Sequence, residues 1–111
     1  MKKRTGRELP PSTARLIAAL CGEYTRMKDA LGGSEIDRRT GEIYRYLLSL
    51  MLDEAERCLS LRACQAEELI MDIAANRGYA LSQLSQLISR KRYYSAKRRM
   101  LYGLAARLRL I

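Results

Sequence analysis

Apolar residues recur at three- and four-residue steps along most of this chain, which is the spacing of one face of an α-helix. From residue 12 to residue 31 the face consists of Leu16, Ile17, Leu20, Tyr24, Met27 and Leu31. Ser12 is suited to cap such a helix, and Gly32 and Gly33 are suited to end it. The pattern therefore predicts a first helix over residues 12–31.

A second apolar stripe predicts a helix that runs to about Leu59, through Ile36, Ile43, Leu47, Leu50 and Met51. Ser34 is its expected cap, with Asp37 three residues on as an acidic variant of a capping box. Gly41 leaves open whether a short turn precedes the longer helix. Residues 46–52 are apolar almost all round, so we expect this helix at the centre of the fold or against a second copy of the chain.

Three further helical segments are expected after residue 60. Ser60 is suited to cap the first, and Gly78 is suited to close it as a left-handed C-cap. A short helix should follow over 81–88, with Leu81, Leu84, Leu87 and Ile88 as its apolar edge. Ser89 should then cap a last helix whose inward stripe is Tyr93, Met100, Leu101, Leu104, Ala105, Leu108 and Ile111.

The composition favours helices over strands. The chain of 111 residues has no Phe, Trp or Val, so its core must come from Leu, Ile, Met and Ala, with Tyr in the larger gaps. We predict a disordered basic arm over 1–11 and a single all-α domain of four to five helices over 12–111. Within that domain, 12–59 would hold the N-terminal helices, with a homodimer interface as an open alternative, and 60–111 the functional unit.

The charge is distributed unevenly. Residues 1–72 contain twelve Lys and Arg and twelve Asp and Glu, whereas residues 73–111 contain nine Lys and Arg and no acid. A segment with a single sign of charge attracts polyanions and steers them toward it. The C-terminal third is thus expected to bind DNA, RNA or another anionic partner, with a solvated basic face as the alternative.

Several functional classes are disfavoured by the composition. There is no histidine, and Cys21, Cys58 and Cys64 lack CxxC spacing, so we expect neither a metal site nor another cofactor. We read Cys21 and Cys58 as core residues of a protein of the reducing cytoplasm. No window is apolar enough for a membrane span. Nor do we expect an enzyme, because a general base is missing and Glu67 and Glu68 point to different sides of a helix.

The order of the last elements is that of a helix-turn-helix: helix, glycine turn, short helix, serine-capped turn, basic helix. Residues 89–101 read SRKRYYSAKRRML. They resemble the closing helix of sigma-factor region 4 and of phage late-transcription regulators of the RinA and ArpU type. Ser89, Tyr93, Met100, Leu101 and Leu104 occupy the family's pattern positions. The preceding segment departs from it, with Gln83 and Leu87 where the family has Ala and Gly, so either the turn is shorter or the two helices cross differently.

What the resemblance implies is DNA-binding transcriptional regulation in a phage or mobile element, with the basic helix in the major groove. The expected nucleic-acid contacts are Arg77, Ser89, Arg90, Lys91, Arg92, Tyr94, Lys97 and Arg98. Lys and Arg on phosphates supply affinity, whereas an arginine near the helix start could read guanine edges. Tyr94 is expected outward, Tyr93 in the core, and Gln83 and Gln86 either at phosphates or merely at the surface.

A different class of function stays open. The chain could be a small phage-encoded interaction protein, an adaptor or inhibitor of a host nucleoprotein complex that uses the same basic surface on an acidic protein or an RNA. A basic amphipathic helix on an anionic membrane is a weaker third reading. The sequence argues against it, because its apolar stripe lacks Trp and Phe and is needed for the core.

Overall fold

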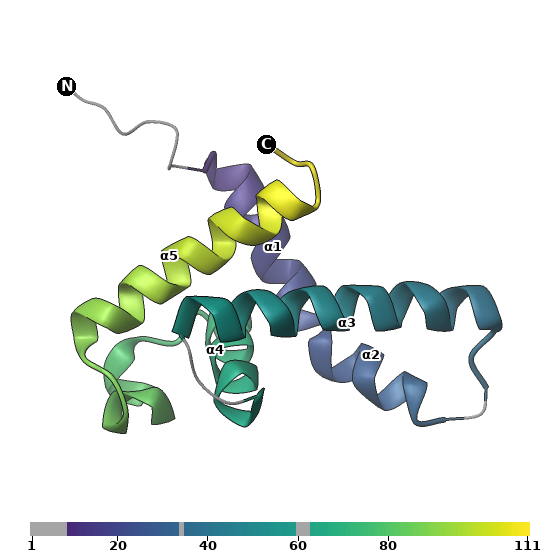
Figure 1. The fold of residues 1–111 in the computed structure, drawn as a ribbon, viewed down its shortest axis with the longest axis horizontal. Helices are drawn as coiled ribbons and strands as arrows, with labels where there is room; N and C mark the ends of the chain where they lie inside the picture. Colours follow the sequence, from purple (N-terminus) through teal and green to yellow (C-terminus); the bar gives the residue numbers. More distant parts are fainter. Residues whose placement is uncertain (1–8, 34, 60–62) are drawn as a thin grey trace.

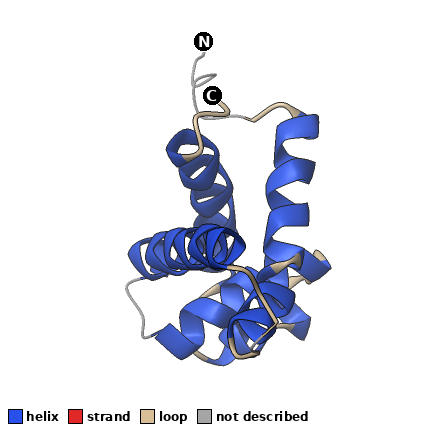
Figure 2. Ribbon diagram, turned by 90° about the vertical axis from the view of Figure 1, so that its right-hand side faces the viewer, coloured by secondary structure: helices blue, strands red, loops and turns tan. Residues whose placement is uncertain are grey.

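Five α-helices and two short 3-10 turns make up the part of the chain that the computed structural model describes, residues 9–33, 35–59 and 63–111. The elements are α1 (Pro11–Gly22), α2 (Tyr24–Leu31), α3 (Arg38–Leu59), α4 (Ala63–Ala75), η2 (Tyr79–Leu81), η3 (Gln83–Gln86) and α5 (Arg90–Arg107). These residues include no strand (Figure 2). The predicted all-α class with four to five helices is confirmed, four if α1 and α2, which only Glu23 separates, are counted as one.

The helices pack around α3 and α4. α3 contacts α2, α4 and α5, and α1 contacts α4 and α5. The N-terminal half of α3 extends beyond the other long helices and is accompanied mainly by α2 (Figure 1). The connection that carries η2 and η3 lies at the opposite end of the molecule, beside the start of α5 (Figure 1).

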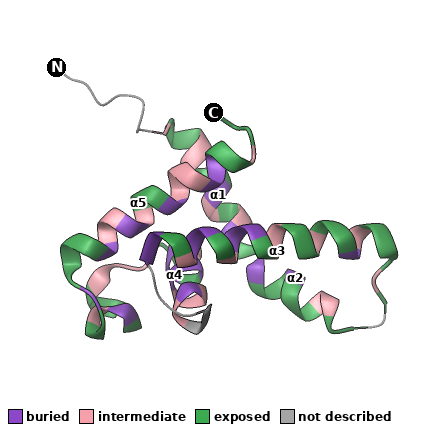
Figure 3. Cartoon of the chain, in the orientation of Figure 1, coloured by how far each residue is buried: buried purple, intermediate pink, exposed green. Residues whose placement is uncertain are grey.

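The core consists of the residue types that the composition predicted, and buried positions recur between more exposed ones along α3 and α5 (Figure 3). Its largest fully buried side chains include Tyr93, Ile17, Met27, Met51, Leu59, Leu69, Ile70, Leu84, Met100 and Leu104. Cys21 and Cys58 are buried as expected, and burial raises the pKa of the Cys21 thiol to about 12. Within the described residues, no helix is both long and apolar enough to cross a membrane.

The first predicted helix is interrupted. It begins at Pro11 rather than after Ser12, because proline is well suited to the first helical position, and Pro11 therefore does not belong to the expected arm. The helix ends at Gly22, and the Glu23 N–H donates to the Leu20 carbonyl at 3.0 Å. A separate helix, α2, then begins at Tyr24. Residues 1–8 of the expected arm lie outside the described residues.

The cap of α3 differs from the prediction. Asp37 itself caps the helix, because its Oδ1 accepts from the Thr40 N–H at 2.8 Å and its Oδ2 from the Thr40 hydroxyl at 3.0 Å. Ser34, the predicted cap, lies outside the described residues, as does Ser60 before α4. Gly41 does not split the helix. α3 is buried mainly in its C-terminal half, and Ile43 and Tyr46 in its N-terminal half are about half exposed.

The end of α4 is closed by another residue than predicted. Asn76 adopts the left-handed conformation, with φ 53°, whereas Gly78 has φ −78°. Asparagine tolerates this region better than most residues with a side chain. The Arg77 N–H then donates to the Asp72 carbonyl at 2.8 Å. This hydrogen bond holds the chain against the end of α4. Gly78 is thus not the C-cap.

The predicted helix over 81–88 is wrong. Ser82 has an extended backbone, with φ −87° and ψ 142°, and separates the 3-10 turns η2 and η3. Its hydroxyl accepts from the Leu84 N–H at 3.0 Å and also donates to Asp72. Leu84 and Ile88 are buried, but Leu81 and Leu87 are exposed, so only half of the predicted apolar edge faces the core.

The last helix largely agrees with the prediction. The Ser89 hydroxyl accepts from the Arg92 N–H at 3.2 Å, which confirms the N-cap. Tyr93, Met100, Leu104 and Ala105 are buried along the inward stripe. Ile111 is 52 % exposed and is not part of it, because α5 ends at Arg107 and the chain turns at Arg109, with φ 62°. Leu101 and Leu108 are half-buried.

Candidate nucleic-acid interface

The nine cations of residues 73–111 fall into two groups in the structure. Five of them bond to groups of the protein itself: Arg77, Arg92, Lys97, Arg99 and Arg107. Four do not form a hydrogen bond or ion pair with a described residue: Arg90, Lys91, Arg98 and Arg109. The predicted interface is therefore only partly available to a ligand.

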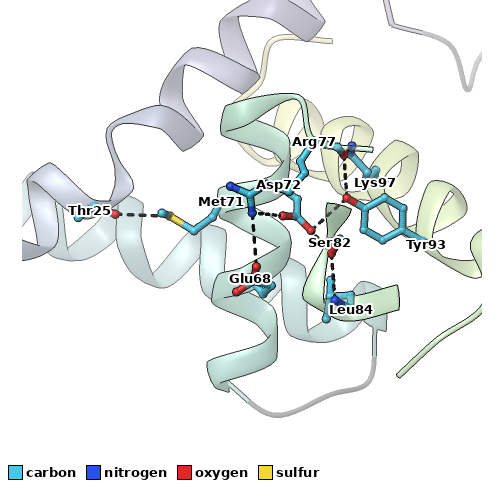
Figure 4. A network of polar contacts seen from close by, with 9 residues as sticks. All are labelled: Thr25, Glu68, Met71, Asp72, Arg77, Ser82, Leu84, Tyr93 and Lys97. Atoms are coloured by element: carbon cyan, nitrogen blue, oxygen red, sulfur yellow. Dashed lines mark hydrogen bonds and ion pairs between the residues drawn. The ribbon is translucent and has the colours of Figure 1, made fainter. Parts of the chain in front are cut away.

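A buried carboxylate binds Arg77, the first cation of the internally bonded group. Asp72, in the last turn of α4, is 0 % exposed and accepts from Arg77 Nη1 at Oδ1 over 2.7 Å (Figure 4). Its Oδ2 accepts from the Ser82 hydroxyl and lies 3.0 Å from the Tyr93 hydroxyl. Among the described residues, every buried side-chain N or O atom has a hydrogen-bond partner. The network joins α4, the connection and α5 in one polar cluster.

Arg77 belongs to this cluster rather than to a free surface. Besides Asp72 it approaches Glu68 at 3.5 Å, and its side chain is 34 % exposed. The sequence pattern proposed Arg77 as a nucleic-acid contact because of its position in the turn. Two carboxylates of α4 instead hold its guanidinium, so it mainly neutralises the protein's own charge. Glu67, on another side of the helix, bonds to Tyr24 and Lys28.

Lys97 and Tyr94 are also directed toward the connection. Lys97 Nζ donates to the Arg77 carbonyl at 2.8 Å and lies 5.0 Å from the centre of the Tyr93 ring. Desolvation lowers the pKa of Lys97 from its usual range. The Tyr94 hydroxyl accepts from the Tyr79 N–H at 3.0 Å, so Tyr94 is half-buried and does not point outward as predicted. Both side chains contribute first to holding residues 77–79.

Arg92 and Arg99 reach in the other direction, to the end of α3. Arg92 Nη2 donates to the Leu59 carbonyl at 2.6 Å, and Arg99 Nη2 donates to the Cys58 carbonyl at 2.7 Å. The last carbonyls of a helix lack partners within the helix and carry partial negative charge, so cations are favourable there. Both arginines are nevertheless exposed residues.

The outer side of α5 carries the remaining cations of its first half. Arg90 follows the Ser89 cap, and its guanidinium lies 5.2 Å from the centre of the Tyr79 ring. Lys91 and Arg98 are exposed and have no bond to a described residue. They are seven residues apart, two helical turns, and so lie on one face about 10 Å apart along the axis. We call Arg90, Lys91 and Arg98 the α5 cationic face.

The described residues offer little else in the way of a binding site. They contain no group of three or more Cys, Asp or Glu side chains that could hold a metal ion. Two open cavities, of about 310 and 320 Å³, lie beside α2. The first is lined by Ala30, Gly33, Glu35, Ile36, Thr40 and Tyr44, and the second by Tyr24, Thr25, Lys28, Asp29, Glu67, Glu68 and Met71. None of the eight predicted contact residues lines either cavity.

Sequence reasoning missed Asp72, the residue on which the cluster depends. One signal was present: an acidic residue directly between Met71 and Ile73 in an apolar stretch, five residues before an arginine. A carboxylate at such a position is buried only if cations and hydroxyl groups neutralise it. Comparison with protein-family models, with curated proteins and with solved structures finds no match to this chain, so the likeness to sigma-factor region 4 stays a prediction.

Proposed function

We propose that this protein binds duplex DNA through the α5 cationic face and acts as a transcriptional regulator of a phage or mobile element. The observation that carries the proposal is charge. The last 39 residues contain no acid, and Arg90, Lys91 and Arg98 project from one helix without an internal counter-charge. Nothing in this segment repels a phosphate backbone. The mechanism is electrostatic capture followed by docking of the first half of α5.

The internal bonds of α5 support the proposal in a second way. Ser89 caps the helix, Arg92 and Arg99 bond to the end of α3, and the exposed Lys91 and Arg98 form no bond to a described residue. The first half of α5 is thus held in position before any ligand arrives. Because the backbone of this half of α5 is already ordered, binding to a rigid polyanion need not order it first.

The test is a fluorescence anisotropy titration of a labelled duplex of random sequence over a salt series. Each phosphate contact contributes about −0.9 to the slope of log K against log salt concentration. Replacing Lys91 and Arg98 together with Ala should therefore make the slope shallower by roughly 1.8. Lys97 is left intact, because its bond to the Arg77 carbonyl would confound binding with stability.

The matched control is Arg38→Ala with Arg39→Ala at the start of α3. Both are exposed arginines and remove the same charge, but they lie on another helix. Their slope should remain at the wild-type value. An equal loss in both double variants would indicate only a net-charge effect, and absence of duplex binding by the wild type at ~50 mM salt would refute the proposal.

A further inference from the structure

Two leucines in the connection between α4 and α5 project into solvent. Leu81, the last residue of η2, is 79 % exposed, and Leu87, directly after η3, is 54 % exposed. Leu84, between them, is 1 % exposed and packs in the core. The connection thus buries one leucine and displays two others at the end of the molecule where α5 begins (Figure 1).

The backbone that carries these leucines is held on several sides. The Tyr79 hydroxyl donates to the carbonyl of Ile88 at 2.6 Å or of Ser85 at 3.0 Å, and the Tyr79 N–H donates to the Tyr94 hydroxyl. Ser82 is bonded to the buried Asp72. Because these bonds fix the connection between its two ends, the leucines cannot turn inward without breaking them. Their exposure is a feature of the ordered structure rather than of a loose loop.

The surrounding charge selects the kind of partner. Leu87 lies three residues before Arg90, and Arg90 covers the ring of Tyr79 in the same 3-10 turn as Leu81. Lys91 is the next exposed cation, and no acid occurs anywhere after Asp72. An apolar pair flanked by cations fits a partner with apolar surfaces between anionic groups. Stacked base pairs between two phosphate backbones have this arrangement.

We propose that Leu81 and Leu87 insert between base steps of the duplex, while the cations at the start of α5 hold the adjoining phosphates. Apolar side chains such as leucine act in this way when they enter from the minor groove, and they kink the duplex by 20–90°. The inference rests on the proposed DNA binding and adds to it that the protein bends its DNA.

The experiment measures binding and bending together, on a 30-base-pair duplex with a fluorophore at each end. Wild-type protein should raise the energy transfer between the ends, and it should bind more tightly when the duplex carries a central mismatch that is already unstacked. Leu81→Ala with Leu87→Ala should weaken binding roughly tenfold, remove the rise in energy transfer and leave the salt slope unchanged. Both residues are exposed, so the far-ultraviolet circular dichroism should stay that of the wild type.

The matched control is Leu16→Ala with Ile43→Ala, which removes two side chains of similar exposure, 55 % and 51 %, from α1 and α3. It should bind and bend like the wild type. If the Leu81 and Leu87 variant also binds and bends like the wild type, the insertion is refuted and DNA binding stands. If the wild type binds no duplex at all, both proposals fail. Binding to vesicles with anionic headgroups that requires the two leucines, without bending of DNA, would assign them to a lipid surface instead.

Discussion

The Tyr93 hydroxyl of α5 lies 3.0 Å from Oδ2 of the buried Asp72 in α4 and 2.9 Å from the carbonyl oxygen of Arg77. The Tyr93 side chain therefore connects the first turn of α5 to the last turn of α4. Tyr93→Phe removes this bond and keeps the ring. We expect the free energy of unfolding to fall by about 1.5–3 kcal/mol, the usual contribution of a hydrogen bond to a charged group, as measured by urea denaturation. Tyr46→Phe, at a tyrosine that is 56 % exposed, should change it by less than about 0.5 kcal/mol.

Gly103 of α5 lies directly against the Glu54 side chain of α3. A Cβ atom there would lie 2.1 Å from Glu54 Oε2 and 2.6 Å from its Cδ. Glu54 is 5 % exposed and bonds to Arg107, so it has little room to move. Gly103→Ala should lower the free energy of unfolding by about 1–3 kcal/mol, although alanine favours the helix by up to about 1 kcal/mol.

The control for that substitution is Gly22→Ala at the end of α1. A Cβ atom there meets nothing within 4 Å, and the backbone has a negative φ. We expect it to be neutral or to stabilise the protein by up to about 1 kcal/mol. If Gly103→Ala proved as harmless as Gly22→Ala in the same denaturation assay, the close approach of the two helices would be contradicted.

Arg92 and Arg99 should matter for stability, whereas Lys91 and Arg98 should not. The first pair donates to the Leu59 and Cys58 carbonyls, and the second pair has no bond to a described residue. Arg92→Ala and Arg99→Ala should each cost about 1 kcal/mol in thermal or urea unfolding. Lys91→Ala and Arg98→Ala should stay within about 0.5 kcal/mol. Equal effects in all four variants would refute the division of the cations into two groups.

The stability should depend on pH in the acid range. Hydrogen bonds lower the pKa of Glu67, with the bond from Lys28 as the larger cause and that from Tyr24 as the next. A hydrogen bond from Arg107 lowers the pKa of Asp53. Because both pKa values are lower in the folded than in the unfolded state, the stabilisation is present above the unfolded values of about 4 and is lost as the pH falls through the folded ones.

The melting temperature should accordingly be nearly constant between pH 8 and 6, since the chain has no histidine, and should fall progressively below about pH 4.5. Thermal unfolding at fixed salt concentration measures this. Glu67→Gln, which removes the titrating group, should make the acid decline less steep. A melting temperature that stays level down to pH 3 would show that the two ion pairs contribute nothing.

The elements that sequence reasoning placed correctly are those set by local chemistry. The Ser89 cap and the inward stripe of α5 follow from the spacing of neighbouring residues. The cap is confirmed, and the stripe is confirmed for Tyr93, Met100, Leu104 and Ala105. Such features need no information about distant parts of the chain, so a single sequence is sufficient for them.

Several features that were predicted wrongly depend on distant partners. Ser82 breaks the expected short helix because its hydroxyl bonds to Asp72, ten residues earlier. Tyr94 was predicted to point outward from helical periodicity, and Arg77 was predicted as a contact from its position in the turn. Their partners, the Tyr79 N–H and Asp72, come from other segments. Helical periodicity shows which side of a helix faces inward, but it does not show which polar group of another segment lies next to a given side chain. The predicted contacts Arg90, Lys91 and Arg98 are exposed, whereas Arg77, Tyr94 and Lys97 bond within the protein.

The hydrogen bonds that hold the connection between α4 and α5 also bear on the rate at which this surface could capture a ligand. A surface that must reorganise waits for its binding-competent state, and its association rate falls with the population of that state. Here Tyr79, Ser82 and Tyr93 fix the connection in the free protein. Encounters with a polyanion would then be limited by diffusion and by long-range attraction, which makes the association rate, more than the dissociation rate, the quantity that salt controls.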